Sequence, residues 1–157
     1  MDDYLLLKTV HILSSTLLFG TGLGTAFHGW MANRSGDAAA RRVVNRQVVL
    51  ADWLFTTPAV IVQPVTGVWL ALIAGHPLTS GWLVASMALY LLVGVCWLPV
   101  VGIQIEMRRI ADRTPAGEAL PQRYFHLSRT WFLLGWPAFI GVIIIFWLMV
   151  AKPEIAW

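Results

Sequence analysis

The chain has 157 residues, of which 58% are hydrophobic and only 12% are charged, and its mean hydropathy is +0.70. A water-soluble domain of this length and composition would expose a very large apolar surface, so the sequence excludes a soluble globular fold. The formal charge of +3 comes from arginines that lie between the apolar runs, so it predicts no nucleic-acid partner.

The first apolar run, residues 4–31, is long enough to cross a membrane and contains three ionisable side chains. A helix of about 20 residues crosses about 30 Å of hydrocarbon. Ionisable groups are costly in hydrocarbon, so Lys8, His11 and His28 are candidate functional residues.

One face of this first run carries little side-chain bulk. At about 100° per residue, His11 lies on one stripe with several smaller residues. This stripe predicts a void that holds either a flat ligand or another helix. Its members are His11, Ser15, Leu18, Gly22 and Thr25.

The second apolar run, residues 48–74, contains Pro58 and Pro64. Each proline removes a backbone hydrogen bond and loosens the helix, which in a bundle widens a cavity. The preceding residues, 32–47, predict a turn and an interfacial helical piece. Asp52 follows closely, and we expect it to form an interfacial salt bridge.

The salt-bridge partner that we expect for Asp52 is Arg46 or Arg129. The remaining apolar runs span residues 82–107 and 125–150. Together the four runs predict an all-α integral membrane protein, a single four-helix antiparallel bundle over residues 1–157.

The arginines also predict which way the bundle faces. They lie in the first and third connections, whereas the second connection, GHPLTSG, has no Lys or Arg. Basic residues favour cytoplasmic loops. We therefore expect loops one and three in the cytoplasm and both termini outside it.

The histidines suggest two candidate metal sites. Neutral imidazole is the usual protein ligand of haem iron, and methionine is a common sixth ligand. His11 with Met87 is a candidate axial pair at the outer depth, the half of the bundle near the two termini. His28 with His126 is a candidate pair at the inner depth, the half near the arginine-rich connections. At the outer depth, Lys8 can place a haem propionate.

Each histidine also has a purely structural interpretation. His11 can hydrogen-bond a carbonyl or hydroxyl of a neighbouring span, while His28 and His126 can lie among lipid headgroups. The sequence has no phosphate-binding glycine loop, no HExxH and no CxxC motif, which argues against a hydrolase or a nucleotide enzyme.

Several short motifs occur along the whole chain in the order of a known membrane family. They are LLLKTVHIL, Phe19-Gly20, His28, residues 54–59, residues 67–70, Gly81-Trp82-Leu83, Trp136-Pro137 and Ala151-Lys152-Pro153. With these motifs the chain resembles the small bacterial membrane family called domain of unknown function 2269. More remotely, it is similar to the HemJ-type protoporphyrinogen IX oxidases, although it has Thr56, Ser86 and Trp97 where that family has Met, Lys and His.

The resemblance implies a haem-associated bundle in the bacterial inner membrane, with His11 as a haem ligand. We therefore predict a protein that binds haem b or a related tetrapyrrole and has an electron-transfer or oxidoreductase role. The alternative is a cofactor-free accessory or small-solute transport protein. The expected partners are the lipid bilayer, a tetrapyrrole and a second copy of the chain.

Overall fold

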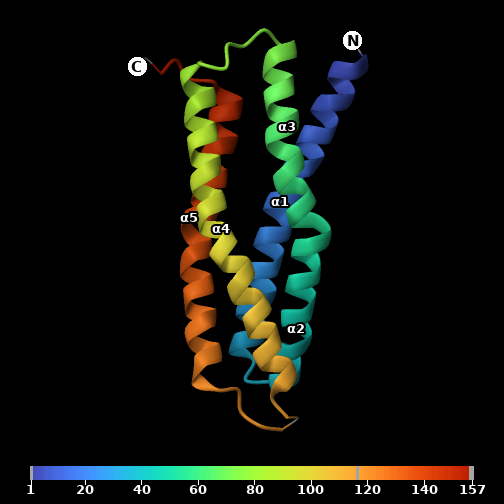
Figure 1. The fold of residues 1–157 in the computed structure, drawn as a ribbon, viewed down its shortest axis with the longest axis vertical. Helices are drawn as coiled ribbons and strands as arrows, with labels where there is room; N and C mark the ends of the chain where they lie inside the picture. The colour runs from blue at the N-terminus through green and yellow to red at the C-terminus, as the bar shows by residue number, and fades with distance from the viewer. Residues whose placement is uncertain (1, 116, 156–157) are drawn as a thin grey trace.

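Long helices form one elongated bundle in the computed structural model, which describes residues 2–115 and 117–155 (Figure 1). Within this part of the chain, four helical segments are long and apolar enough to cross a membrane. The all-α fold is therefore confirmed. The elements are α1 (Asp2–Arg34), α2 (Ala38–Ala51), η1 (Asp52–Thr56, a π-helix), α3 (Thr57–Ile73), α4 (Gly81–Arg113) and α5 (Gln122–Ala151).

The two ends of the bundle differ in charge. Both ends of the described chain lie at the top of Figure 1, with the connection between α3 and α4. The other two connections, residues 35–37 and the described residues 114–115 and 117–121, lie at the bottom, where most of the arginines gather. We call this the basic end.

The second long segment starts earlier than the span we expect from the sequence. α2 begins at Ala38 because Asp37 caps it: the Asp37 carboxylate accepts from the Ala39 backbone N–H at 2.7 Å. Residues 38–47, expected as an interfacial piece, are thus the first turns of a helix that continues through η1 and α3.

The π-helix η1 is explained by the proline that follows it. Pro58 has no N–H to donate to the carbonyl of Leu54, and its ring crowds that carbonyl. The chain forms a wider turn instead, in which the Thr57 N–H donates to the Asp52 carbonyl. The helix therefore bulges between α2 and α3 and continues without a break (Figure 1).

The helices pack as two groups. α4 and α5 contact each other extensively, while α1 lies mainly against α2, η1 and α3. One buried apolar cluster joins α4 to α5 and the last connection toward the basic end, around Met107, Tyr124 and Trp131. A second joins α3, α4 and α5 at the opposite end, around Trp82 and Leu148. The middle of the bundle contains neither cluster.

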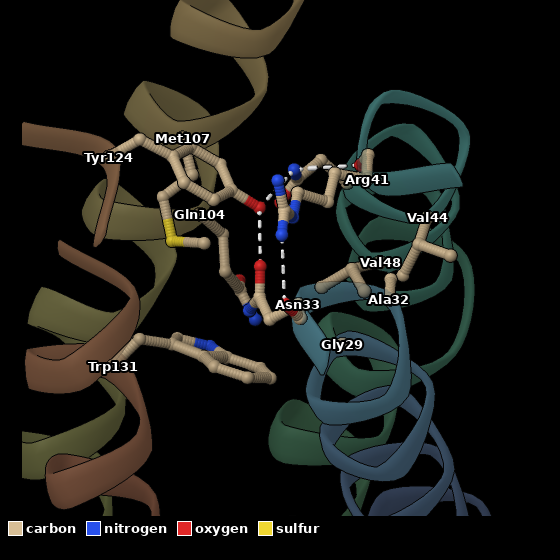
Figure 2. Close-up of a pocket in the computed structure, with 11 residues that line it drawn as sticks. Gly29, Ala32, Asn33, Arg41, Val44, Val48, Gln104, Met107, Tyr124 and Trp131 are labelled. Carbon is tan, nitrogen blue, oxygen red and sulfur yellow. Dashed lines mark hydrogen bonds between the residues drawn. The ribbon is translucent and has the colours of Figure 1, made fainter. Parts of the chain in front are cut away.

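A polar cluster ties three helices together at the basic end (Figure 2). The Tyr124 hydroxyl donates to Asn33 Oδ1 at 3.0 Å and accepts from Asn45 Nδ2 at 2.9 Å. Arg41 donates to the Asn33 carbonyl at 2.9 Å. Tyr124 is only 1% exposed, so these hydrogen bonds link α1, α2 and α5 in a dry environment.

The salt bridge expected between Asp52 and Arg46 or Arg129 is wrong. Arg46 Nε instead bonds Asp112 Oδ1 on α4 at 2.8 Å, and Asp52 bonds within η1. The spacing from 46 to 52 corresponds to about one and two-thirds helical turns, so the two side chains leave the helix on different faces.

Other charged contacts hold α4 at the basic end. Glu106 lies 3.8 Å from Arg109 and 3.1 Å from Arg123 at the start of α5. Arg42 Nε donates to the Ala111 carbonyl at 2.9 Å and so fastens α2 to the last turns of α4.

We expect Tyr124→Phe to destabilise the bundle. The substitution keeps the ring but leaves Asn33 Oδ1 without this donor and removes an acceptor from Asn45, so the free energy of unfolding should fall by about 1–3 kcal/mol. Thermal unfolding in detergent, followed by circular dichroism, measures the change as a lower Tm. The control is Tyr4→Phe, at a tyrosine whose ring lies beside Lys8. Equal Tm values for the two variants would contradict the role of the cluster.

Candidate ligand cavity

An apolar cavity of about 400 Å³ lies in the middle of the bundle, between α1, η1, α4 and α5. Glycines on three helices create this space. Gly22, Gly94 and Gly135 line the cavity, and a Cβ added at any of them would meet no atom within 4 Å. The volume falls in the range typical of small-molecule sites.

The cavity opens sideways between α1 and α5. The lining side chains of α4 and η1 are buried or half-buried, whereas several on α1 and α5 are exposed. In a membrane this opening faces lipid. The large exposed residues at the opening are Leu23, Phe27, Trp30, Phe132 and Trp136.

Aromatic side chains bound the cavity at both ends. Away from the basic end, the Phe19 ring stacks on Phe139 with 5.0 Å between ring centroids and joins α1 to α5. Toward the basic end, Trp131 and Gln104 line both the cavity and the polar cluster of Figure 2, where the indole lies across the space below Tyr124. Trp131 packs directly on Gly29, where an added Cβ would lie 3.0 Å from the indole.

The inner wall of the cavity carries a buried carboxylate. Asp52 is 6% exposed, and its Oδ1 accepts from Thr56 Oγ1 at 2.8 Å. Asp52 Oδ2 and Gln104 Oε1 are buried and have no hydrogen-bond partner within the described residues. The Gln104 side chain lies beside that of Asp52. The wall of an otherwise apolar space therefore contains a buried carboxylate and a buried amide, whose two oxygens lie beneath the surface of the cavity.

Tyr90 closes the wall between α4 and α3. Pro64 has no N–H, so the Val60 carbonyl lacks its usual helical donor. The Tyr90 hydroxyl supplies one at 2.5 Å. Tyr90 is thus occupied by the backbone of α3 and leaves Asp52 as the main polar group of the cavity.

His11 lies outside this cavity, against α3. Its Nδ1 is 2.8 Å from Thr66 Oγ1, and the imidazole packs on Gly67, where an added Cβ would lie 3.1 Å from the ring. Because the Thr66 hydroxyl donates its proton to the Val62 carbonyl at 2.7 Å, His11 Nδ1 must be the donor to Thr66. The Nε2 lone pair is therefore available as an acceptor or a metal ligand.

The other residues predicted at the outer depth do not gather around His11. Lys8 is exposed, with its Nζ 5.8 Å from the centre of the Tyr4 ring. Met87 is half-buried on α4, whereas the imidazole of His11 contacts α3. Neither Lys8 nor Met87 lines the cavity.

The inner candidate pair lies on the outside of the bundle. His28 and His126 are exposed on α1 and α5. His28 Nδ1 lies 2.8 Å from the carbonyl of Gly24 in its own helix. No cluster of three or more His, Cys, Asp or Glu side chains suited to a metal ion occurs in the part of the chain that the structure describes.

Part of the stripe predicted on the first run does line the cavity. Leu18, Gly22 and Thr25 line the cavity together with bulkier α1 residues such as Phe27 and Trp30, while His11 and Ser15 do not line it. The sequence reasoning missed Gly94 and Gly135. Isolated glycines in apolar helices were the available signal, but nothing in the sequence shows that both point to the same space.

We expect opposite stability changes from two substitutions at the polar wall. Asp52→Asn keeps the oxygen that accepts from Thr56, removes the buried charge and provides an N–H close to the Gln104 oxygen. It should raise the free energy of unfolding by about 1–3 kcal/mol. Thr56→Val removes the donor to Asp52 Oδ1 and should lower the free energy of unfolding by about 1–3 kcal/mol. Thermal unfolding in detergent measures both, and a lower Tm for Asp52→Asn would show that the carboxylate is already satisfied.

The comparison with known families gives one match. The family model described as a predicted integral membrane protein (DUF2269) matches residues 5–153, nearly the whole chain. No curated protein and no solved structure matches the chain.

Proposed function

The chain belongs to the DUF2269 family of predicted integral membrane proteins, and from this premise we propose that it binds a hydrophobic, membrane-soluble molecule in its central cavity. The observation that carries this proposal is the cavity of about 400 Å³, lined by the glycines of three helices and open sideways between α1 and α5. A molecule dissolved in the bilayer reaches such an opening without crossing water.

The polar wall indicates how such a ligand is oriented. Its apolar body lies between the aromatic side chains of α1 and α5, and its polar group reaches Asp52 and Gln104. A plain hydrocarbon chain in the cavity would leave the Asp52 carboxylate without a counter-ion, which is costly in a medium of low dielectric. The cavity therefore favours an amphipathic ligand over the acyl chains of ordinary lipids.

We expect Gly94→Leu to abolish ligand retention because the leucine side chain projects into the cavity. Small molecules extracted from the purified protein are measured by mass spectrometry. One species should be enriched in the wild type and at least about tenfold depleted in the variant, a loss of about 1.4 kcal/mol or more in binding.

The matched control is Gly102→Leu. Gly102 lies on the same helix, is exposed, has no atom within 4 Å of an added Cβ, and does not line the cavity. This control should retain the wild-type ligand. Identical extracts from all three proteins, with no species enriched over the membrane lipids, would overturn the proposed function.

We further propose that the basic end faces the cytoplasm of a bacterium and that the protein lies in the inner membrane. Arg34, Arg46 and Arg123 lie at this end, as do the connections of residues 35–37 and 114–121. The positive-inside rule then places both termini on the periplasmic side.

A second candidate function is haem or tetrapyrrole binding at His11, with an electron-transfer or oxidoreductase role. It is favoured by the hydrogen bond from His11 Nδ1 to Thr66, which orients the ring and leaves Nε2 as a ligand atom. Within the described residues no His, Met or Cys lines the large cavity. A tetrapyrrole held by His11 therefore requires a separate site, on the surface of α1 and α3.

Optical spectra test this second function. After haem reconstitution, the wild type should show a Soret band that shifts on reduction by dithionite, and His11→Ala should lack it. Thr66→Val removes the acceptor that orients the imidazole and should weaken haem binding by about 10- to 100-fold. A colourless wild type, or a band that survives in His11→Ala, would contradict haem ligation by His11. A band lost only in His28→Ala would assign it to the inner histidines.

A further inference from the structure

We propose that the central cavity selects a lipophilic amine, whose protonated nitrogen lies against Asp52 and whose apolar body extends between α1 and α5. The inference rests on the proposed function, namely that the cavity holds a membrane-soluble ligand. It goes further by assigning the chemical class of that ligand and the residue that recognises it.

The first argument is charge. Asp52 is the only carboxylate among the described residues that line the cavity, and none of them is Lys, Arg or His. Arg46, the nearest arginine along the helix, is held by Asp112 at the basic end. A carboxylate that is 6% exposed in an apolar wall requires a counter-ion or a proton. A cationic ligand supplies the counter-ion that the protein lacks.

The second argument is hydrogen bonding. Thr56 donates to Oδ1 of Asp52, and the Gln104 side chain lies within hydrogen-bonding reach of the same carboxylate, but both groups are neutral. Neutral donors do not balance the charge of the carboxylate, so a cationic donor is the partner that this wall lacks. An ammonium group has three N–H donors and no acceptor. A ligand that ends in a carboxylate or a phosphate would repel Asp52, and one that ends in a ketone would leave its charge unbalanced.

The third argument is the nature of the walls. Aromatic side chains come from three helices, among them Phe27 of α1, Trp97 of α4 and Trp136 of α5. The faces of aromatic rings attract organic cations, most strongly when water is excluded. The rings therefore suit an amine with an aromatic or apolar body, and Gly22, Gly94 and Gly135 leave room for it.

A pair of isosteric probes tests the inference. Protein purified in a nonionic detergent is titrated with 1-naphthylmethylamine and with 1-naphthylmethanol, and binding is followed by tryptophan quenching. The wild type should bind the amine at least about tenfold more tightly than the alcohol, a preference of about 1.4 kcal/mol or more. Asp52→Asn should bind both probes with similar affinity. Gly94→Leu should lose both, and Gly102→Leu should behave as the wild type.

The other outcomes separate the two proposals. If the wild type binds both probes equally and Gly94→Leu abolishes binding, the cavity takes neutral ligands: the amine inference is overturned and the proposed function stands. If the amine preference persists in Asp52→Asn, another group recognises the cation, which also overturns the inference. If the wild type binds neither probe in a way that Gly94→Leu reduces, both proposals fail.

Discussion

The need to satisfy every backbone polar group inside a membrane shapes the middle of this bundle. Water is absent there, so a carbonyl that loses its helical donor must find another partner. Pro58 and Pro64 each remove one donor from the long helix that runs from α2 through α3. At Pro58 the helix forms the wider turn of η1. At Pro64 the hydroxyl of Tyr90, which reaches across from α4, donates to the Val60 carbonyl in place of the missing N–H.

The wider turn of η1 and the Tyr90 hydrogen bond together determine the polar wall of the cavity. η1 places Asp52 and Thr56 one turn apart on the same face of the helix, so the threonine donates to the carboxylate. The Tyr90 hydroxyl donates to the Val60 carbonyl of α3, so it adds little polarity to the cavity. The packed clusters and the Asn33, Asn45 and Tyr124 contacts hold the ends of the bundle. A gap in the middle is therefore compatible with a stable fold.

The lengths and apolar character of the four runs were enough to predict the helices, because crossing hydrocarbon imposes a minimum length that any sequence reveals. The α1 stripe of Leu18, Gly22 and Thr25 was also visible, since helical periodicity alone places those residues together. What periodicity lacks is the rotation of one helix against the next. The expected pairing of Asp52 with Arg46 or Arg129 fails for a different reason. Residues 32–47 were expected as an interfacial piece separate from the span, whereas Arg46 and Asp52 lie on one continuous helix and leave it on different faces.

The limit of periodicity applies to His11 as well. Its ring meets Thr66 and Gly67 of α3, and that contact depends on the depth at which α1 and α3 align, which no pattern within α1 specifies. The π-helix adds a second difficulty, because one wider turn shifts the facing of every residue that precedes it relative to those that follow. No periodic pattern in the sequence relates Gly94 to Gly135. That both line the same cavity is therefore visible only once α4 and α5 are packed together.

A carboxylate with no counter-ion in an apolar wall makes little sense as a packing device. A leucine or asparagine at position 52 would avoid the desolvation cost of the charge, and Thr56 would find other acceptors in its own helix. Departures from good packing that carry such a cost are characteristic of sites that bind something. The position of the departure matters as much as its chemistry, because Asp52 lies on the wall opposite the lateral opening and not at the basic end, where arginines would neutralise it. A ligand that enters from lipid between α1 and α5 meets apolar and aromatic side chains first and the charge last, which is the order in which an amphipathic cation loses its water and finds its counter-ion.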